Sequence, residues 1–481
     1  MLKNGLSNII GAIIRLAISV ITVPLLIRFL GLETYGLWTL ISTAIAIISL
    51  AEGGLSVSAT VFLSHDLDKG DNEALSETLT TITTFIFILA TIASVSMCVC
   101  ANLTIDLFGS MSIDRRSIGI AGIQIASVAV WAKLFQQVMM GVEQACQRYQ
   151  EMNILNVLQS TIINIGILTI AYFGGNLIQL MQWTVLVTAL ASIGHIVICY
   201  ESLKNIDLRI KWNIKRSLEI LKYSSLTWTA TIGTVLFSQF DRVIVSNLLG
   251  INALGIYAAI TNVASQINVL SALPIQPLVP FISRSWNNEN RDLSVITKKI
   301  HQVVRTNSVL SLGLGLIFFV LALPVMQYLL KRIPSHQEIL EFRSAVIIYS
   351  IYSLNAVGYY VLLATNGAKL CTIIVTVSGV ISLMFILLGA ASQGVLGAIA
   401  GNAGYMLTIS LIAVGMNRIE IQRSVWIKWF WIPMLWFVLS ILASMNINSD
   451  LAIQVPLLVT QLITISSWLL VLQIKDLNHA T

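Results

Sequence analysis

About fourteen apolar segments, each about 20 to 30 residues long, run through this chain, and four of the charged side chains within them bear most directly on function. An apolar run of about 20 residues is long enough to cross the hydrocarbon core of a membrane as a helix. These four residues are Arg15, Glu52, Lys133 and Asp241, and a charge inside a membrane helix is costly unless it faces protein or water. The sequence therefore predicts an all-α integral membrane protein with a polar interior.

Composition agrees with this class, because 56% of the residues are hydrophobic and only 10% are charged. The segments between the apolar runs leave no room for a separate soluble domain. Although the net charge is +6, the basic residues lie in short loops and form no single solvated face, so no nucleic-acid partner is expected. The five cysteines lack CxxC spacing and a nearby histidine cluster, so we expect no metal site and no cofactor.

The predicted membrane helices follow one another along the whole chain. The first six are expected at about residues 9–30, 36–63, 79–108, 117–141, 152–173 and 177–200. The next six are expected at about 222–249, 252–282, 302–331, 339–366, 369–390 and 394–417, and the last two at about 427–446 and 450–473.

Lysine and arginine are unevenly divided between the two sides of this predicted topology. With the N-terminus inside, most of them fall in cytoplasmic segments, above all in the loop 201–221 and in the segment 284–305. The external segments hold only Arg28, Arg115, Arg116, Lys331, Arg332 and Arg343. The positive-inside rule therefore predicts that both termini are cytoplasmic, which agrees with an even number of spans.

A turn motif occurs twice, at corresponding places in the two groups of six helices. Leu30-Gly31-Leu32 followed by Gly36-Leu37-Trp38 returns as Leu249-Gly250-Ile251 followed by Gly255-Ile256-Tyr257, a displacement of 219 residues from Gly31 to Gly250. Since six helices separate the copies, both repeats enter the membrane in the same direction, with a symmetry axis along the membrane normal and a cleft between them. We expect an N-terminal six-helix bundle at 1–200, a basic cytoplasmic linker at 201–221, a C-terminal six-helix bundle at 222–417, and two additional helices within 418–481.

Three of the charged side chains are expected at similar depths in the first bundle. At about 1.5 Å per residue from the predicted cytoplasmic helix ends, Arg15, Lys133 and Glu52 lie about 9, 12 and 16 Å deep. Two cations and one anion make a net positive layer, which suits an anionic ligand such as a phosphate or pyrophosphate. Alternatively, Arg15 reaches the membrane surface and Glu52 neutralises Lys133.

Polar residues recur at helical spacing on three other predicted helices. On the helix 222–249 they form one face that ends in a carboxylate: Thr227, Thr231, Thr234, Ser238 and Asp241. The helices 152–173 and 339–366 carry amide and aromatic stripes, Asn153, Asn156, Ser160 and Asn164 on one and Tyr352, Asn355, Tyr359 and Asn366 on the other. Such groups can line a path for sugars, with Asp241 binding a proton or cation. The alternative is hydrogen bonding between helices, with Asp241 paired to a basic side chain.

The chain resembles the polysaccharide transporter branch of the MOP flippase superfamily, which includes the O-antigen and other lipid-linked oligosaccharide flippases. The resemblance rests on about fourteen spans, the duplication, the turn from Arg28 to Trp38 (RFLGLETYGLW) and the segment Leu50-Ala51-Glu52-Gly53-Gly54-Leu55. It implies movement of an undecaprenyl-pyrophosphate-linked oligosaccharide from the cytoplasmic to the external leaflet of a bacterial cell (inner) membrane, by alternating access of the two bundles. Membrane lipid and other polysaccharide assembly proteins are the implied partners.

This resemblance also bears on energy coupling. Relatives with a sodium site use a carboxylate on helix 7 together with acidic or amide residues on helix 11; Asp241 could supply the first, but the segment 369–390 has no Asp, Glu or Asn. Coupling to a proton, to another cation or to the membrane potential therefore stays open. In this interpretation Arg15 and Lys133 bind the pyrophosphate, while Asp241 or Glu52 biases the inward-to-outward equilibrium.

Two other functions, export of organic cations and catalysis in the membrane, are the alternatives to flipping. A multidrug or organic-cation exporter of the same superfamily would share the architecture, but it should favour a net acidic cavity. A membrane glycosyltransferase or polysaccharide polymerase would need a sizeable catalytic loop, whereas the longest predicted loops have about 20 residues and the sequence holds neither a Gly-rich phosphate loop nor a metal-ligand motif. We therefore expect a transporter and not an enzyme.

Overall fold

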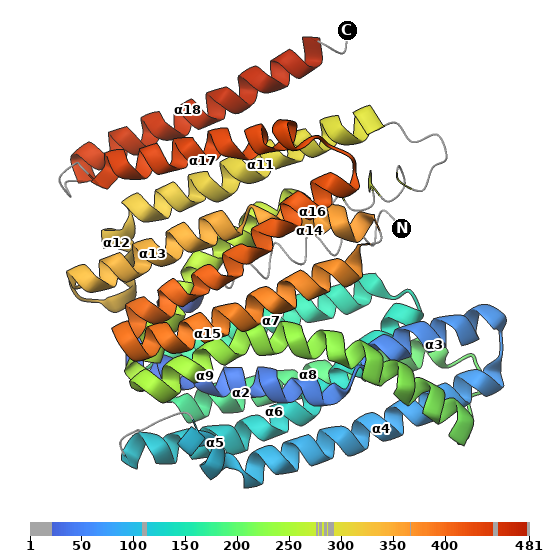
Figure 1. Cartoon of the computed structure of the whole chain (residues 1–481). Helices are drawn as coiled ribbons and strands as arrows, with labels where there is room; N and C mark the ends of the chain where they lie inside the picture. The colour runs from blue at the N-terminus through green and yellow to red at the C-terminus, as the bar shows by residue number, and fades with distance from the viewer. Residues whose placement is uncertain are drawn as a thin grey trace. The chain divides into compact units, whose positions relative to one another are not determined.

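The computed structural model describes residues 22–107, 113–275, 293–365, 367–445 and 451–478, together with residues 278, 281, 282 and 286. Every element in these ranges is a helix, which confirms the all-α prediction (Figure 1). The first half contains α2 (Leu32–Ile48), η1 (Ser49–Glu52), α3 (Leu55–Lys69), α4 (Asn72–Val99), α5 (Ala101–Leu107), α6 (Ile113–Ala145), α7 (Tyr149–Tyr172), α8 (Leu177–Leu203) and α9 (Ile214–Ala272). The second half contains η2 (Leu273–Ile275), α11 (Leu293–Val320), α12 (Ala322–Leu330), α13 (His336–Tyr352), α14 (Asn355–Ala364), α15 (Ala368–Gly401), η3 (Asn402–Ile409), α16 (Ser410–Arg418), α17 (Arg423–Met445) and α18 (Leu451–Asn478).

Among the described residues, ten helical stretches are long and apolar enough to cross a membrane, so the chain is a multi-pass membrane protein. One of these stretches, Ala368–Arg418, contains two predicted spans, and most of the predicted span 9–30 precedes residue 22, where the description begins. The predicted count of fourteen is therefore not confirmed.

Several helices begin where the side chain of the preceding residue caps the free backbone N–H groups. Asp71 accepts hydrogen bonds from the N–H groups of Glu73 and Ala74 at the start of α4. Asn176 at the start of α8 and Ser335 at the start of α13 form reciprocal capping boxes with the residue three positions later. These polar residues fix the helix ends that the apolar periodicity alone leaves vague.

The two copies of the glycine turn have the same backbone conformation. Gly31 has φ 78° and ψ 164°, and Gly250, which interrupts α9, has φ 83° and ψ 175°. Each copy also packs on the other: a Cβ on Gly36 would lie 2.4 Å from the Ile251 carbonyl oxygen, and one on Gly255 would lie 2.4 Å from that of Leu32. A reciprocal contact of this kind is what a two-fold relation between two repeats requires.

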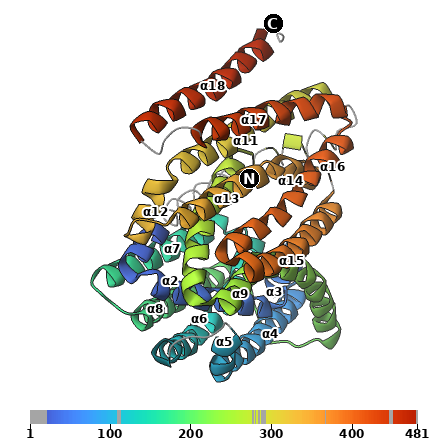
Figure 2. The same cartoon turned by 60° about the vertical axis from the view of Figure 1, so that its left-hand side comes forward.

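Contacts divide the chain into two compact units, Met1–Ile256 and Tyr257–Thr481. In the first unit α6 is central and packs against α2, α3, α4 and α8 (Figure 1). In the second unit α11 packs against α13, α17 and α18, and α14 packs against α16 (Figure 2). The division falls inside α9, so the bundles predicted from the repeat at 1–200 and 222–417, with 418–481 outside them, stay a prediction.

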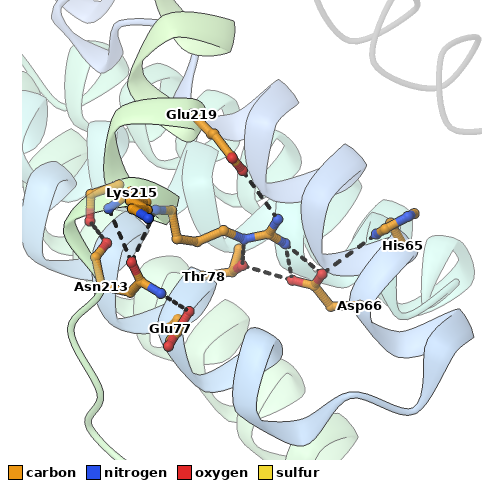
Figure 3. A network of polar contacts seen from close by, with 9 residues as sticks. His65, Asp66, Glu77, Thr78, Asn213, Lys215 and Glu219 are labelled. Atoms are coloured by element: carbon orange, nitrogen blue, oxygen red, sulfur yellow. Dashed lines mark hydrogen bonds and ion pairs between the residues drawn. The ribbon is translucent and has the colours of Figure 1, made fainter.

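The basic segment 201–221 is fastened to the first unit by a polar network around Asp66 (Figure 3). The buried Asp66 carboxylate accepts hydrogen bonds from the Arg216 guanidinium and from the Thr78 hydroxyl, each at 2.7 Å to Oδ2. The guanidinium also lies over the Phe62 ring, 4.9 Å from its centroid, and Asn213 donates to Glu77 at 2.9 Å. This segment is therefore held on α3 and α4 along its length.

Candidate functional site

A polar cavity of about 380 Å³ lies within the first unit, among α2, α6, α7 and α8. Its walls come from residues three or four positions apart on each helix, so that one face of α6, one of α7 and one of α8 meet there. The residues that line it are Ile45, Ala129, Lys133, Gln136, Gln137, Met140, Asn156, Gln159, Ser160, Ile163, Thr184 and Thr188. Among the described residues, the lining contains one cation, several amides and hydroxyls, and no carboxylate.

Lys133 is the charged residue of this lining, and it makes no hydrogen bond or ion pair with another described residue. The side-chain amide oxygen of Gln137, Oε1, is buried in the same lining and likewise has no hydrogen-bond partner among the described residues. A partly desolvated ammonium and a buried acceptor are both costly when unsatisfied. A ligand that brings negative charge and hydroxyl donors would satisfy both groups.

Behind the cavity, a chain of hydrogen bonds leads to two ionisable side chains. Gln136 and Gln159 form a reciprocal amide pair, with N···O distances of 2.6 and 3.2 Å. The other hydrogen of the Gln136 amide points to His195 Nε2 at 3.2 Å, and His195 Nδ1 lies 2.8 and 3.0 Å from the two Glu143 oxygens. The side chains of His195 and Glu143 have no exposed surface.

Glu52, predicted to share a layer with Lys133, has a different environment. It ends the short helix η1 and is buried, and its carboxylate accepts a hydrogen bond from the backbone N–H of Ser56 in the first turn of α3. Gly53 and Gly54 follow it with φ 67° and 78°, and this left-handed backbone separates η1 from α3. Glu52 and Lys133 form no ion pair in the described part of the structure, and the predicted role of Glu52 in coupling stays a prediction.

The predicted polar face of the helix 222–249 is described only in part. The Thr227 hydroxyl donates to the Ser224 carbonyl oxygen at 2.9 Å, a hydrogen bond within α9. The side chains of Thr231, Thr234 and Ser238 lie outside the described part of the structure, as does Arg15. Asp241 is buried, and one of its oxygens accepts the backbone N–H of Arg242 at 2.8 Å. Its role in coupling is untested.

The asparagine stripe on α7 divides into two kinds of residue. Asn156 lines the cavity, together with Ser160. Asn153 and Asn164 instead donate to the carbonyl oxygens of Tyr149 and Ser160 at 2.7 Å, one turn back on the same helix. The structure therefore brings Asn156 to Lys133, while Asn153 and Asn164 are absent from the lining of this cavity.

The stripe on the predicted helix 339–366 lies in the second unit. The Asn355 amide is buried and donates to the Thr408 hydroxyl at 2.6 Å, a contact between α14 and η3. The Tyr352 ring contacts the rings of Tyr349 and Tyr405, with centroids 6.3 and 6.1 Å apart, and Tyr359 contacts Tyr360 at 5.4 Å. Interhelical hydrogen bonding thus accounts for Asn355, whereas the tyrosines form an aromatic group. Asn366 lies outside the described residues.

The sequence prediction names only three of the twelve lining residues, Lys133, Asn156 and Ser160. Gln136, Gln159, Thr184 and Thr188 were not singled out, although Gln136 and Gln159 follow the spacing of Lys133 and Asn156. His195 has no other histidine near it in the sequence, so no histidine pattern indicates a site there. Glu143 and His195 are 52 residues apart, and only the packing of α8 on α6 brings them together.

Many apolar helices around a partly open cavity with polar side chains in its lining are typical of multi-pass membrane transport proteins. Residues 1–286 match the family model described as polysaccharide biosynthesis protein. Because this match covers more than half of the chain, the protein belongs to that family, which is the branch of the MOP flippase superfamily indicated by the glycine turn. A sequence comparison with curated proteins finds no match.

Solved structures with the same fold include both flippases and drug transporters. The lipid II flippase MurJ in its inward closed conformation matches with a TM-score of 0.73 and 13% identity, over 99% of this chain and 100% of that one. An inward-facing multidrug resistance MATE family transporter of the MOP superfamily matches at 0.63 and 16%, over 85% and 98%. An outward-facing one matches at 0.54 and 17%, over 87% and 96%. These matches confirm the predicted MOP flippase fold.

Proposed function

We propose that this protein moves an undecaprenyl-pyrophosphate-linked oligosaccharide from the cytoplasmic to the external leaflet of the bacterial cell membrane by alternating access. The observation that carries this proposal is the cavity in which Lys133 lies among amides and hydroxyls and has no partner among the described residues. An ammonium binds pyrophosphate oxygens through charge-assisted hydrogen bonds, and amides exchange hydrogen bonds with sugar hydroxyls. Membership of the polysaccharide biosynthesis family supports the same substrate class.

In this mechanism Lys133 attracts the pyrophosphate, with Arg15 as the predicted second cation. Gln137 and Asn156 offer acceptors and donors to the sugar next to it. The lipid tail stays in the bilayer, because moving it into a polar cavity would lose the favourable free energy of its burial among apolar chains. Binding can shift the protein between its two states only by the difference in affinity that each state has for the ligand, so the cationic lining must differ between them.

Export of organic cations is the second candidate, because drug transporters share the fold. The sign of the cavity charge weighs against it: the lining carries Lys133 and no carboxylate among the described residues. A desolvated cation beside an unpaired ammonium would be repelled.

The test is the fate of lipid-linked oligosaccharide in cells that lack the gene. We expect the intermediate to accumulate on the cytoplasmic leaflet and wild-type protein to clear it. Lys133→Gln should reduce clearance about tenfold or more, since a hydrogen bond to a charged group contributes about 1.5–3 kcal/mol. Lys222→Gln, which removes an exposed lysine of α9 outside the cavity lining, is the control and should clear normally. Normal clearance by Lys133→Gln at equal abundance would remove the cavity from the mechanism.

A further inference from the structure

The two ionisable side chains behind the cavity form a hydrogen-bonded pair that solvent does not reach. Glu143 on α6 and His195 on α8 have no exposed side-chain surface, and His195 Nδ1 is 2.8 Å from the nearer Glu143 oxygen. A buried carboxylate is costly unless it is paired or protonated. The pair therefore has two states that differ by one proton: ionised glutamate with neutral imidazole, or the same two groups with one proton more.

These two states make opposite demands on Gln136. Without the additional proton, Nδ1–H donates to the carboxylate and the bare Nε2 must accept, so Gln136 has to present its N–H. With the proton, whether the pair is imidazolium with carboxylate or imidazole with carboxylic acid, Nε2 carries hydrogen and Gln136 has to present its oxygen. The structure has the first arrangement, with the Gln136 Nε2 atom 3.2 Å from His195 Nε2.

A reversal of Gln136 cannot remain local. Its amide is joined to that of Gln159 by two hydrogen bonds, and one donor and one acceptor must meet in each. When Gln136 turns over, Gln159 must turn over as well. Both glutamines line the cavity beside Lys133, so the pattern of donors and acceptors offered to a ligand changes with the proton.

We infer that the Glu143–His195 pair is a proton-binding site. Its protonation state sets the orientation of the Gln136 and Gln159 amides, and so the donors and acceptors that line the cavity. This inference deepens the proposed function and rests on it for the identity of the ligand, but proton binding itself does not. One proton is taken from water and forms one N–H or O–H bond. By linkage, a ligand that prefers one pattern of donors also changes the affinity of the pair for the proton.

Other ionisable groups near the pair are few among the described residues. They are Glu151 on α7, which is hydrogen-bonded to Arg148 at 2.8 Å, and the thiols of Cys146 and Cys199. Facing α6 from α3 and α4 are the uncharged side chains of Thr60 and Ser94, which donate to carbonyl oxygens of α6. A carboxyl that titrates here and disappears with Glu143 can therefore be assigned.

The experiment is an infrared titration of the full-length protein in lipid nanodiscs from pH 5 to 9, without substrate. We expect a titrating band, a carboxyl C=O stretch or an imidazole ring mode according to which group holds the proton, that Glu143→Gln abolishes or moves to a different pH. Ser192→Ala is the matched control, because it removes a hydroxyl at the same interface of α8 with α6 that donates to the Ala132 carbonyl oxygen at 3.0 Å. Its band should be unchanged. Identical titrations of wild type and Glu143→Gln would overturn the inference.

A second variant tests the relay, meaning the hydrogen-bond path from His195 through Gln136 to Gln159. It also keeps the test valid if Glu143→Gln fails to fold. Gln136→Met leaves the pair intact, so the band should persist while the pH dependence of clearance in cells, expected at about tenfold, is lost. If clearance by Gln136→Met keeps the wild-type pH dependence, the relay is wrong. If wild type clears no lipid-linked oligosaccharide at any pH, the proposed function fails, whereas the titrating band still decides the proton site.

Discussion

Two charged residues that the sequence places in one layer have different surroundings in the structure. Lys133 faces a cavity and makes no hydrogen bond or ion pair with another described residue. Glu52 is bound to the first turn of α3, where a carboxylate also interacts favourably with the positive end of the helix dipole. An intramembrane cation that finds no protein partner is costly, and this cost makes Lys133 a candidate ligand-binding residue.

For Glu52 we predict that hydrogen bonding matters more than charge. Glu52→Gln keeps an oxygen for the Ser56 N–H and should retain both abundance and export. Glu52→Ala removes the acceptor and should lower stability by about 0.5–2 kcal/mol, as loss of a helix cap does. Thermal unfolding and clearance of the lipid-linked intermediate measure the two effects. Loss of export in Glu52→Gln at normal stability would instead support the predicted coupling role.

At the scale of elements, the duplicated glycine turns are the most regular feature. Gly31 and Gly250 share a backbone conformation with positive φ, and Gly36 and Gly255 allow two backbones to touch. The same substitution is thus expected to act alike at both copies.

We predict that Gly36→Ala and Gly255→Ala each destabilise the protein by about 1–3 kcal/mol, because the new methyl group would overlap a carbonyl oxygen at 2.4 Å. Gly313→Ala in α11 is the control, since its methyl group would meet only a Leu462 side-chain carbon at 3.7 Å. Unfolding temperatures in detergent compare the three. Equal stabilities would show that the turns do not pack in this way.

The basic segment provides a second test at this scale. Arg216→Ala leaves the buried Asp66 carboxylate without its cationic partner and should destabilise the folded protein by about 3–5 kcal/mol. Lys211→Ala breaks an exposed ion pair with Glu73 and should cost about 0–1 kcal/mol. Limited proteolysis between Lys204 and Asn213 should accelerate in the first variant alone. Equal proteolysis rates would mean that Arg216 does not fasten the segment.

For the whole molecule, the sequence predicts well whatever depends on local patterns. Apolar periodicity found the helices, and the repeated motif located the glycine turns at Gly31 and Gly250. The site depended on which helix faces meet, and no local pattern contains that information. Lys133 and Asn156, which local patterns pointed to, lie in the lining of the cavity, and their roles stay predictions. Gln136, Thr188 and the Glu143–His195 pair became visible only from the packing of α6, α7 and α8.

Charge sign then separates functions that one fold can serve. Flippases and drug transporters both match this architecture, so fold alone does not choose a substrate. The described lining of the cavity in the first unit holds an ammonium and no carboxylate, and this charge supports the proposed polyanionic head group over an organic cation.

The most direct measurement compares both substrates in proteoliposomes that contain the purified full-length protein. We predict that undecaprenyl-pyrophosphate-linked oligosaccharide becomes accessible in the opposite leaflet, that Lys133→Gln slows this transfer about tenfold or more, and that ethidium is not accumulated. Accumulation of ethidium with no transfer of the lipid-linked oligosaccharide would contradict the account and identify a cation exporter.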